Sequence, residues 1–184
     1  LWLGCASAPA PRDHFYRLDV AAPAARATPA LPGSLEVDRL RVEAVAQGRR
    51  MLYREAGRPD VISQHSYHYW TDPPGVMLQD ELVRYLRAAG VARSIVTPGI
   101  HVDSDFVLKG RVVRLERHVG GGSARVVVEL EFSLLDSNGR RLLLDESYRE
   151  ERTVAGDGVD VAIGAYEDAL TTIFARLLAD IPQR

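Results

Sequence analysis

The sequence predicts a single α+β domain, a two-layer sandwich in which two main helices pack on one face of a mostly antiparallel mixed sheet. Residues 124–135 alternate between apolar and polar side chains, which is typical of a strand with one packed and one solvated face. Residues 74–89 and 159–179 instead repeat apolar side chains at helical spacing. The order of strands, helix, strands and helix within 184 residues favours two layers around one core.

The N-terminal half contains the less regular strands. A short strand is expected at 14–19, and an extended surface connection at 20–33, where three prolines prevent a continuous helix. Residues 35–45 alternate as one strand that is buried at least partly on both faces. Two further strands, 51–55 and 60–70, are separated by a Gly-Arg-Pro turn.

The first helix is expected to begin at Thr71-Asp72-Pro73-Pro74. Asp72 can accept hydrogen bonds from free backbone N–H groups, and Pro73 fits the first helical position. Gly90 then ends the helix as a residue at C′. The apolar side chains of its core face are Leu78, Leu82, Tyr85, Leu86 and Ala89.

The C-terminal half is predicted to be a meander followed by a helix. After a short strand at 94–97, strands at 106–117, 124–135 and 140–152 follow one another, and Asn138-Gly139 marks the second hairpin turn. The closing helix at 159–179 presents apolar side chains at helical spacing. These are Ala162, Tyr166, Ala169, Leu170, Ile173, Phe174 and Leu177.

The composition excludes several classes of protein. Lys and Arg total 23 and Asp and Glu total 25, a net charge of −2 that argues against a nucleic-acid binder. The single cysteine excludes an internal disulfide and any multi-cysteine zinc or iron–sulfur site. No run of about 18 apolar residues is present, so no transmembrane helix is expected.

The first five residues, Leu-Trp-Leu-Gly-Cys, resemble the end of a bacterial lipoprotein signal, with Cys5 as the lipidation site. Gly4 and Cys5 fit the lipobox, whereas Trp2 and Leu3 depart from its usual Leu and small residue. A buried or incidental thiol is the alternative. Residues 6–13 are rich in Ala, Ser and Pro and predict a tether, which leaves 14–184 as the folded domain.

Acylation at Cys5 would anchor the chain stably, because two or more acyl chains suffice. Ala6 and Ser7 lack the acidic residue that retains some lipoproteins in the inner membrane. By resemblance to that sorting rule, the expected location is the periplasmic leaflet of the outer membrane.

The sequence contains no pattern that indicates catalysis or a cofactor. His65 and His68 are not expected to share a metal, because side chains three residues apart in a strand point to opposite faces. Gly120-Gly121-Gly122 lacks the Lys and Ser/Thr of a phosphate-binding loop and precedes a strand. A Gly-x-Ser-x-Gly elbow is also missing. We therefore expect no metal, no cofactor and no enzymatic activity.

The densest aromatic stretch is Tyr67-His68-Tyr69-Trp70, which is the candidate partner interface. Aromatic side chains bury a large area while keeping a polar tip, as binding surfaces require. Alternation would place Tyr67 and Tyr69 on one face and His68 and Trp70 on the other. Core filling and partner binding both stay open for each pair.

Several short motifs in order resemble the ABC-type transport auxiliary lipoproteins, the PqiC-like family. They are the cysteine, Phe15-Tyr16-Arg17-Leu18 after the tether, Tyr69-Trp70, Pro73-Pro74 and Met77-Leu78-Gln79 at the start of an amphipathic helix. The resemblance covers nearly the whole chain in element order, although each motif is short.

The resemblance implies an outer-membrane lipoprotein that faces the periplasm and takes part in lipid transport without catalytic residues. Its implied partners are an inner-membrane ABC transporter, or a paired inner-membrane protein, and a protein with MCE (mammalian cell entry) domains that forms a tube across the periplasm. The lipoprotein would receive the far end of that tube. A homo-oligomer is expected as well, since exposed sheet edges invite pairing and closed symmetry removes them.

Two other functions remain open. A periplasmic lipid-binding carrier lipoprotein would need an apolar cavity of about 300–1,000 Å³. The apolar faces here look only sufficient to seal two helices against one sheet, which disfavours it. An accessory lipoprotein for assembly of outer-membrane proteins is the other alternative, and recovery of barrel proteins rather than MCE proteins would favour it.

Overall fold

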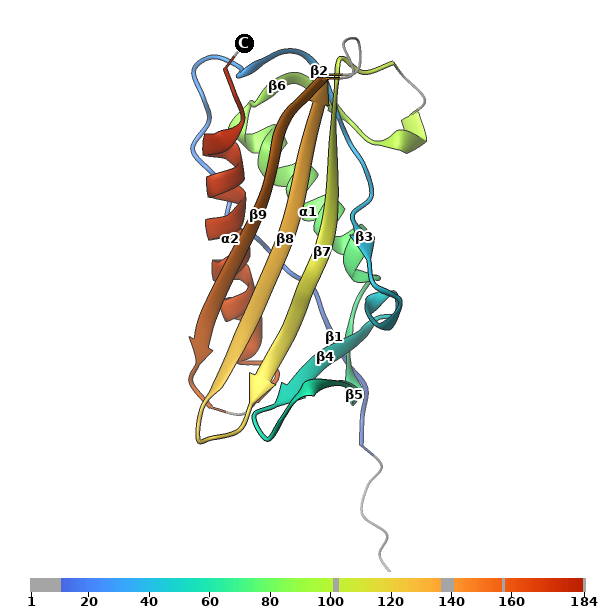
Figure 1. Cartoon of the computed structure of the whole chain (residues 1–184), viewed down its shortest axis with the longest axis vertical. Helices are drawn as coiled ribbons and strands as arrows, with labels where there is room; N and C mark the ends of the chain where they lie inside the picture. Colours follow the sequence, from blue (N-terminus) through green and yellow to red (C-terminus); the bar gives the residue numbers. More distant parts are fainter. Residues whose placement is uncertain (1–10, 101–102, 137–140, 157, 184) are drawn as a thin grey trace, which may run out of the picture.

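The computed structural model describes residues 11–100, 103–136, 141–156 and 158–183. These residues form a curled mixed sheet and two α-helices, in agreement with the predicted α+β class (Figure 1). The strands are β1 (His14–Tyr16), β2 (Leu31–Val37), β3 (Arg41–Val42), β4 (Arg50–Glu55), β5 (Arg58–Trp70), β6 (Ala92–Val96), β7 (Phe106–Val119), β8 (Ala124–Asp136) and β9 (Arg141–Val154). The helices are α1 (Pro74–Ala89) and α2 (Ala162–Asp180).

Strand β7 is the centre of the sheet. On one side it continues into the predicted meander, since β8 pairs with β7 and β9 pairs with β8, both antiparallel. On the other side β2, β3 and β4 pair with β7 in parallel, one after another along its length. The long ladders are therefore antiparallel as predicted. The parallel pairs arise because the chain follows one edge of β7 without reversing direction.

The predicted strand at 35–45 is wrong in its extent. Strand β2 begins earlier, at Leu31, and ends at Val37, and the two-residue β3 is followed by a 3-10 turn at Ala44–Ala46. The interruption places Leu40 in the core, where it is almost fully buried. The connection from residue 17 to residue 30 contains no helix or strand, but Val20 and Ala30 are buried, so it is not entirely a surface segment.

The two helices lie on the same side of the β7–β8–β9 meander (Figure 1). Helix α2 contacts β8 and β9, and α1 contacts β3, β6 and β7. Every side chain predicted for their core faces is buried, which confirms both helical patterns. Within the described part of the chain, neither helix has the length and apolar content needed to cross a bilayer.

The start of α1 differs from the prediction by one residue. Pro73 is the N-cap with extended backbone, Pro74 is the first helical residue, and the Asp72 side chain makes no capping hydrogen bond. The cause is the proline pair, because a residue that precedes proline is disfavoured in helical conformation. The Pro73 carbonyl accepts the first helical hydrogen bonds instead. Gly90 ends the helix in the left-handed conformation, with φ of 65°, as predicted.

A bulge in β7 sets which side chains emerge on each face. The pairing with β8 shifts between Val112 and Arg114, which leaves Val113 as an extra residue. Leu108 and Val112 are buried before the bulge, and Leu115 is buried after it. The side chains of Arg114, Glu116 and His118 therefore lie on the sheet face opposite the helices, hereafter the outer face.

Candidate interaction surface

The three-residue strand β1 brings the first residues of the folded body beside the predicted aromatic stretch at the end of β5. Strand β1 pairs in parallel with the end of β5, so that His14 lies beside His68, Phe15 beside Tyr69 and Tyr16 beside Trp70. Strand β4 lies on the other side of β5. Aromatic side chains from three strands thus gather at this end of the sheet.

His65 and His68 lie on one face, contrary to the prediction. The β4–β5 register shifts between Arg50, which pairs with Tyr69, and Leu52, which pairs with Gln64. The inserted residues break the alternation of β5 and bring the two imidazole centroids to 5.3 Å. Among the described residues, no group of three or more His, Cys, Asp or Glu side chains is arranged to hold a metal ion.

This histidine cluster is surrounded by aromatic rings and one cation. The rings of His14 and His68 stack at 5.2 Å, and the Tyr53 ring lies 4.6 Å from that of His65. The Tyr16 hydroxyl lies 2.9 Å from His68 Nδ1. The buried Arg117 is the cation.

These surroundings disfavour the charged forms of His65 and His68. Burial, together with the charge of Arg117 and the neighbouring His68, lowers the pKa of His65 to about 4. Burial also lowers the pKa of His68, assisted by His14 and Arg117, while Asp160 opposes the change. Both rings are therefore uncharged near neutral pH.

The other face of β1 and β5 presents aromatic rings with arginines. Phe15 stacks on Tyr69 with centroids 5.5 Å apart. The Arg49 guanidinium lies 5.6 Å from the Phe15 centroid, and that of Arg50 lies 5.3 Å from the Tyr69 centroid. Phe15 is nevertheless 54% exposed. These four residues, Phe15, Arg49, Arg50 and Tyr69, form the aromatic–arginine patch.

The four residues of the predicted interface have different surroundings. Trp70 is 1% exposed and meets the Tyr166 ring edge-on at 5.3 Å, so it fills the core. His68 belongs to the histidine cluster and is half-buried. Tyr67 is 42% exposed and Tyr69 lies in the aromatic–arginine patch. The two tyrosines are thus the members that a partner could reach.

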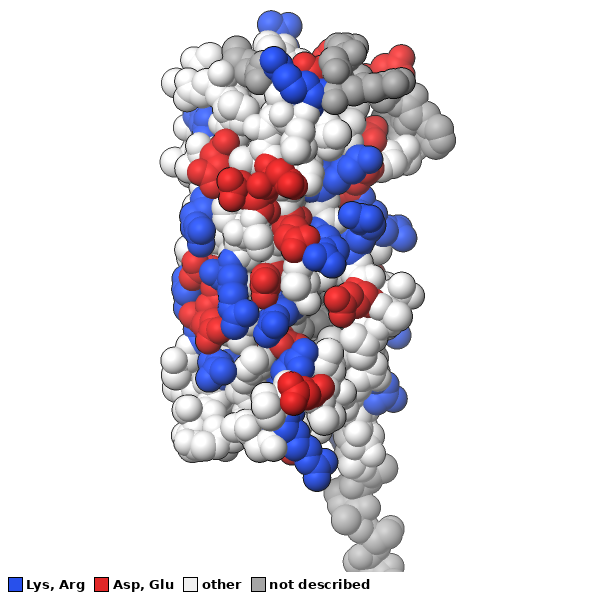
Figure 2. Space-filling model, viewed as in Figure 1, with Lys and Arg blue, Asp and Glu red and all other residues white. Residues whose placement is uncertain are grey.

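The outer face of the meander carries a second polar surface, on which acidic and basic side chains alternate (Figure 2). Glu116, only 2% exposed, contacts Arg54 at 2.8 Å and His118 at 3.0 Å. Arg111 forms a two-pronged ion pair with Glu131 farther along the same strands. The alternation of β8 predicts that its polar side chains lie on the solvated face. The pairing of Glu129 with Arg114 follows from the register shift in β7.

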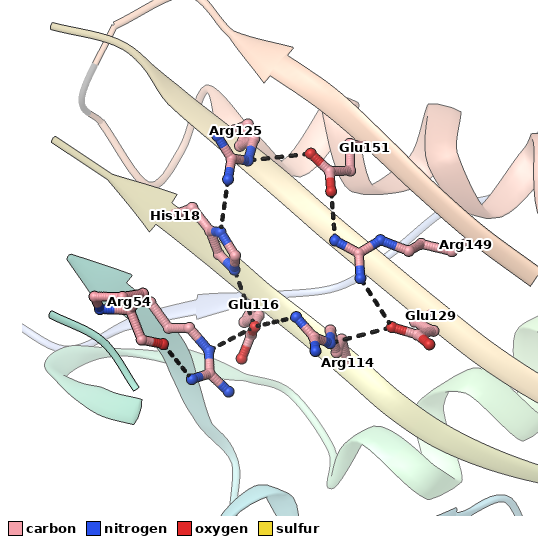
Figure 3. A network of polar contacts seen from close by, with 9 residues as sticks. Arg54, Arg114, Glu116, His118, Arg125, Glu129, Arg149 and Glu151 are labelled. Atoms are coloured by element: carbon pink, nitrogen blue, oxygen red, sulfur yellow. Dashed lines mark hydrogen bonds and ion pairs between the residues drawn. The ribbon is translucent and has the colours of Figure 1, made fainter. Parts of the chain in front are cut away.

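Seven polar side chains of the outer face form a closed ring of contacts, hereafter the charge ring (Figure 3). Each contact in it joins neighbouring residues at 4.0 Å or less, across β7, β8 and β9. The members are Arg114, Glu116, His118, Arg125, Glu151, Arg149 and Glu129. His118 accepts from Arg125 at Nδ1 and contacts Glu116 through Nε2, which assigns the proton of the neutral ring to Nε2.

Comparison with known proteins identifies relatives of the whole body. The family model described as ABC-type transport auxiliary lipoprotein component matches residues 16–178. A search of curated proteins returns no match. Cys5 precedes the matched segment and lies outside the described residues, as does most of the predicted tether.

Solved structures share this fold at low sequence identity. Protein XCC0632 of Xanthomonas campestris, assigned to the DUF330 family, is 22% identical with a TM-score of 0.79, covering 90% of this chain and 92% of that one. The PelC dodecamer of Paraburkholderia phytofirmans is 16% identical with a TM-score of 0.52, covering 88% and 95%. The hypothetical protein CT253 of Chlamydia trachomatis is 7% identical with a TM-score of 0.55, covering 82% and 98%.

Proposed function

Because the chain belongs to the ABC-type transport auxiliary lipoprotein family, we propose that it is a lipid-anchored, non-enzymatic component of an ABC transport system in a bacterial cell envelope. The family match, which spans almost the entire folded body, carries this proposal. Acylation at Cys5 would tether the body, since β1 begins nine residues later. The role of the body is then to bind other proteins of the system.

In its specific form, the proposal places the anchor in the periplasmic leaflet of the outer membrane. The body docks the periplasmic end of an MCE-domain tube, and an inner-membrane ABC transporter or paired protein completes the system. The departure of Ala6 and Ser7 from the inner-membrane retention signal supports the location. The rigid sheet and its charged outer face suit a docking role, because complementary charges fix the register of a partner.

We also propose that the chain acts as a closed homo-oligomer. Strand β9 pairs with β8 alone, so one edge of a 14-residue strand is unpaired within the described chain. Cyclic symmetry would cover such an edge. The PelC of Paraburkholderia phytofirmans, which shares the fold, is a dodecamer.

The proposal is tested by crosslinking in cells that express the wild-type chain, followed by purification and mass spectrometry. We expect an acylated Cys5 and recovery of an MCE-domain protein together with ABC-transport components. The Cys5→Ala variant, expressed at the same level, is the matched control and should recover far less of them. An unmodified Cys5, or recovery of barrel-assembly proteins instead, would contradict the proposal.

A lipid carrier is the second candidate, favoured by one groove. It measures about 640 Å³, within the range of ligand sites, and lies between β3 and the start of α1. Its lining combines Leu40, Val42 and Val76 with Arg39 and Arg41, a composition that suits an acyl chain with a phosphate headgroup. Native mass spectrometry of the purified chain would detect a co-purified lipid if this candidate is right.

A further inference from the structure

The aromatic–arginine patch lies close to the point where the chain leads toward Cys5. Phe15 is the second residue of β1, and His14 stands nine positions after Cys5. Nine extended Cα–Cα steps span at most about 32 Å, because each adds about 3.3–3.6 Å. If Cys5 is acylated, as the proposed function requires, the patch is held within that distance of the leaflet.

The two arginines of the patch differ from those of the charge ring. Arg49 donates to the Thr71 carbonyl, and Arg50 donates to the His65 and Ser66 carbonyls. Among the described residues, no carboxylate forms an ion pair with either one, whereas Arg114, Arg125 and Arg149 all face glutamates. The patch therefore carries positive charge that the folded chain does not neutralise.

An exposed aromatic ring beside such cations matches the chemistry of a bilayer–water interface. Aromatic rings concentrate at headgroup level, and arginine side chains reach phosphate oxygens while their stems cover apolar surface. Guanidinium groups also bind phosphate through two parallel hydrogen bonds. A protein partner is the less favoured occupant, because the patch lies next to the segment that leads to Cys5. The charge ring, on the β7–β8–β9 meander, offers a separate surface of paired charges for a protein.

We propose that the aromatic–arginine patch docks on the phospholipid leaflet that holds the acylated Cys5, with Phe15 at the interface and Arg49 and Arg50 on headgroup phosphates. Docking would orient the body on the membrane and leave the outer face of the meander available to proteins. This inference rests on the proposed anchoring of the chain.

The test measures binding of the full chain to vesicles without the help of an acyl group. The Cys5→Ala chain is the parent, and its sedimentation with vesicles of phosphatidylethanolamine and phosphatidylglycerol is compared with that on pure phosphatidylcholine vesicles. Each variant keeps residues 1–10 of the parent, so that differences report on the patch. Thermal unfolding checks that each variant folds.

We expect Phe15→Ala to weaken binding to the anionic vesicles about ten-fold, and loss of each arginine to weaken it about five-fold. The arginine variants are Arg49→Gln and Arg50→Gln, and added salt should weaken binding of the parent. The controls, Leu142→Ala, which is 54% exposed like Phe15, and Arg93→Gln, exposed on β6, should bind as the parent does.

Equal binding of parent and patch variants would overturn the inference. Loss of crosslinks to an envelope protein in the same variants, with vesicle binding unchanged, would overturn it in favour of a protein interface. An unacylated Cys5 in the wild-type chain would instead contradict the proposed function, since the vesicle assay uses Cys5→Ala and does not depend on acylation.

Discussion

At the β1–β5 end of the sheet, an irregularity in the backbone determines the position and the pKa of a single side chain, His65. His65 reaches Tyr53 and His68 only because the register of β5 shifts, and this placement also buries its ring near Arg117. No described group forms a hydrogen bond with His65 Nε2. The ring therefore packs as an aromatic element, and its surroundings favour the neutral form.

This neutral form makes stability depend on pH. As the pH falls from about 6.5 to about 4, the unfolded chain gains a proton at His65 that the native chain does not bind. The free energy of unfolding should therefore fall across this window, by about 1–2 kcal/mol once solvent screening of the half-buried ring is allowed for. His65→Phe keeps the ring against Tyr53, so its loss should be smaller. Urea denaturation at several pH values tests this, and parallel curves for the two proteins would contradict it.

Glu116 is the other residue whose surroundings predict a large effect. Its carboxylate is nearly inaccessible and contacts Arg54 and His118. Glu116→Gln removes the charge that compensates Arg54 and should lower the free energy of unfolding by about 2–3 kcal/mol. Glu131→Gln, whose partner Arg111 is well exposed, is the matched control and should cost less than about 1 kcal/mol. Equal losses in chemical denaturation would show that burial does not decide the effect.

At the scale of elements, long periodic segments could be predicted from the sequence and irregular ones could not. The core faces of α1 and α2 and the alternation of β8 are properties of consecutive residues, so local spacing is sufficient. The bulges in β5 and β7 depend on the register that each strand adopts against its neighbour, which the spacing of residues within one strand does not encode. The charge ring was missed for this reason. Of the aromatic stretch at 67–70, only Tyr69 lies in the aromatic–arginine patch, and its other members, Phe15, Arg49 and Arg50, come from segments that the sequence analysis did not assign to an interface.

Alanine substitutions at two helical glycines are expected to have opposite effects. Gly75 of α1 lies against the β2–β3 break, whereas Gly164 of α2 faces open space. A methyl group at Gly75 would overlap the Leu40 carbonyl oxygen, whereas nothing lies within 4 Å of one added at Gly164. Gly75→Ala should therefore lower the free energy of unfolding by about 1–3 kcal/mol. Gly164→Ala should raise it by up to about 1 kcal/mol, because alanine favours the helix interior. Thermal unfolding of both variants measures this contrast, and a stabilised Gly75→Ala protein would contradict it.

At the scale of the whole molecule, the free edge of β9 and the charged outer face should together drive association of identical copies. Light scattering of the Cys5→Ala chain should give the mass of a homo-oligomer that loses subunits at high salt, because contacts between exposed charges are screened. Ser147→Glu adds a carboxylate to the exposed surface of β9 near Glu131 and should shift the mass toward the monomer. Ser94→Glu adds the same charge on β6 and should leave the mass unchanged. A Cys5→Ala chain that is strictly monomeric at micromolar concentration would contradict the proposed homo-oligomer. Equal masses for the Ser147→Glu and Ser94→Glu variants would show that the outer face does not form the contact between copies.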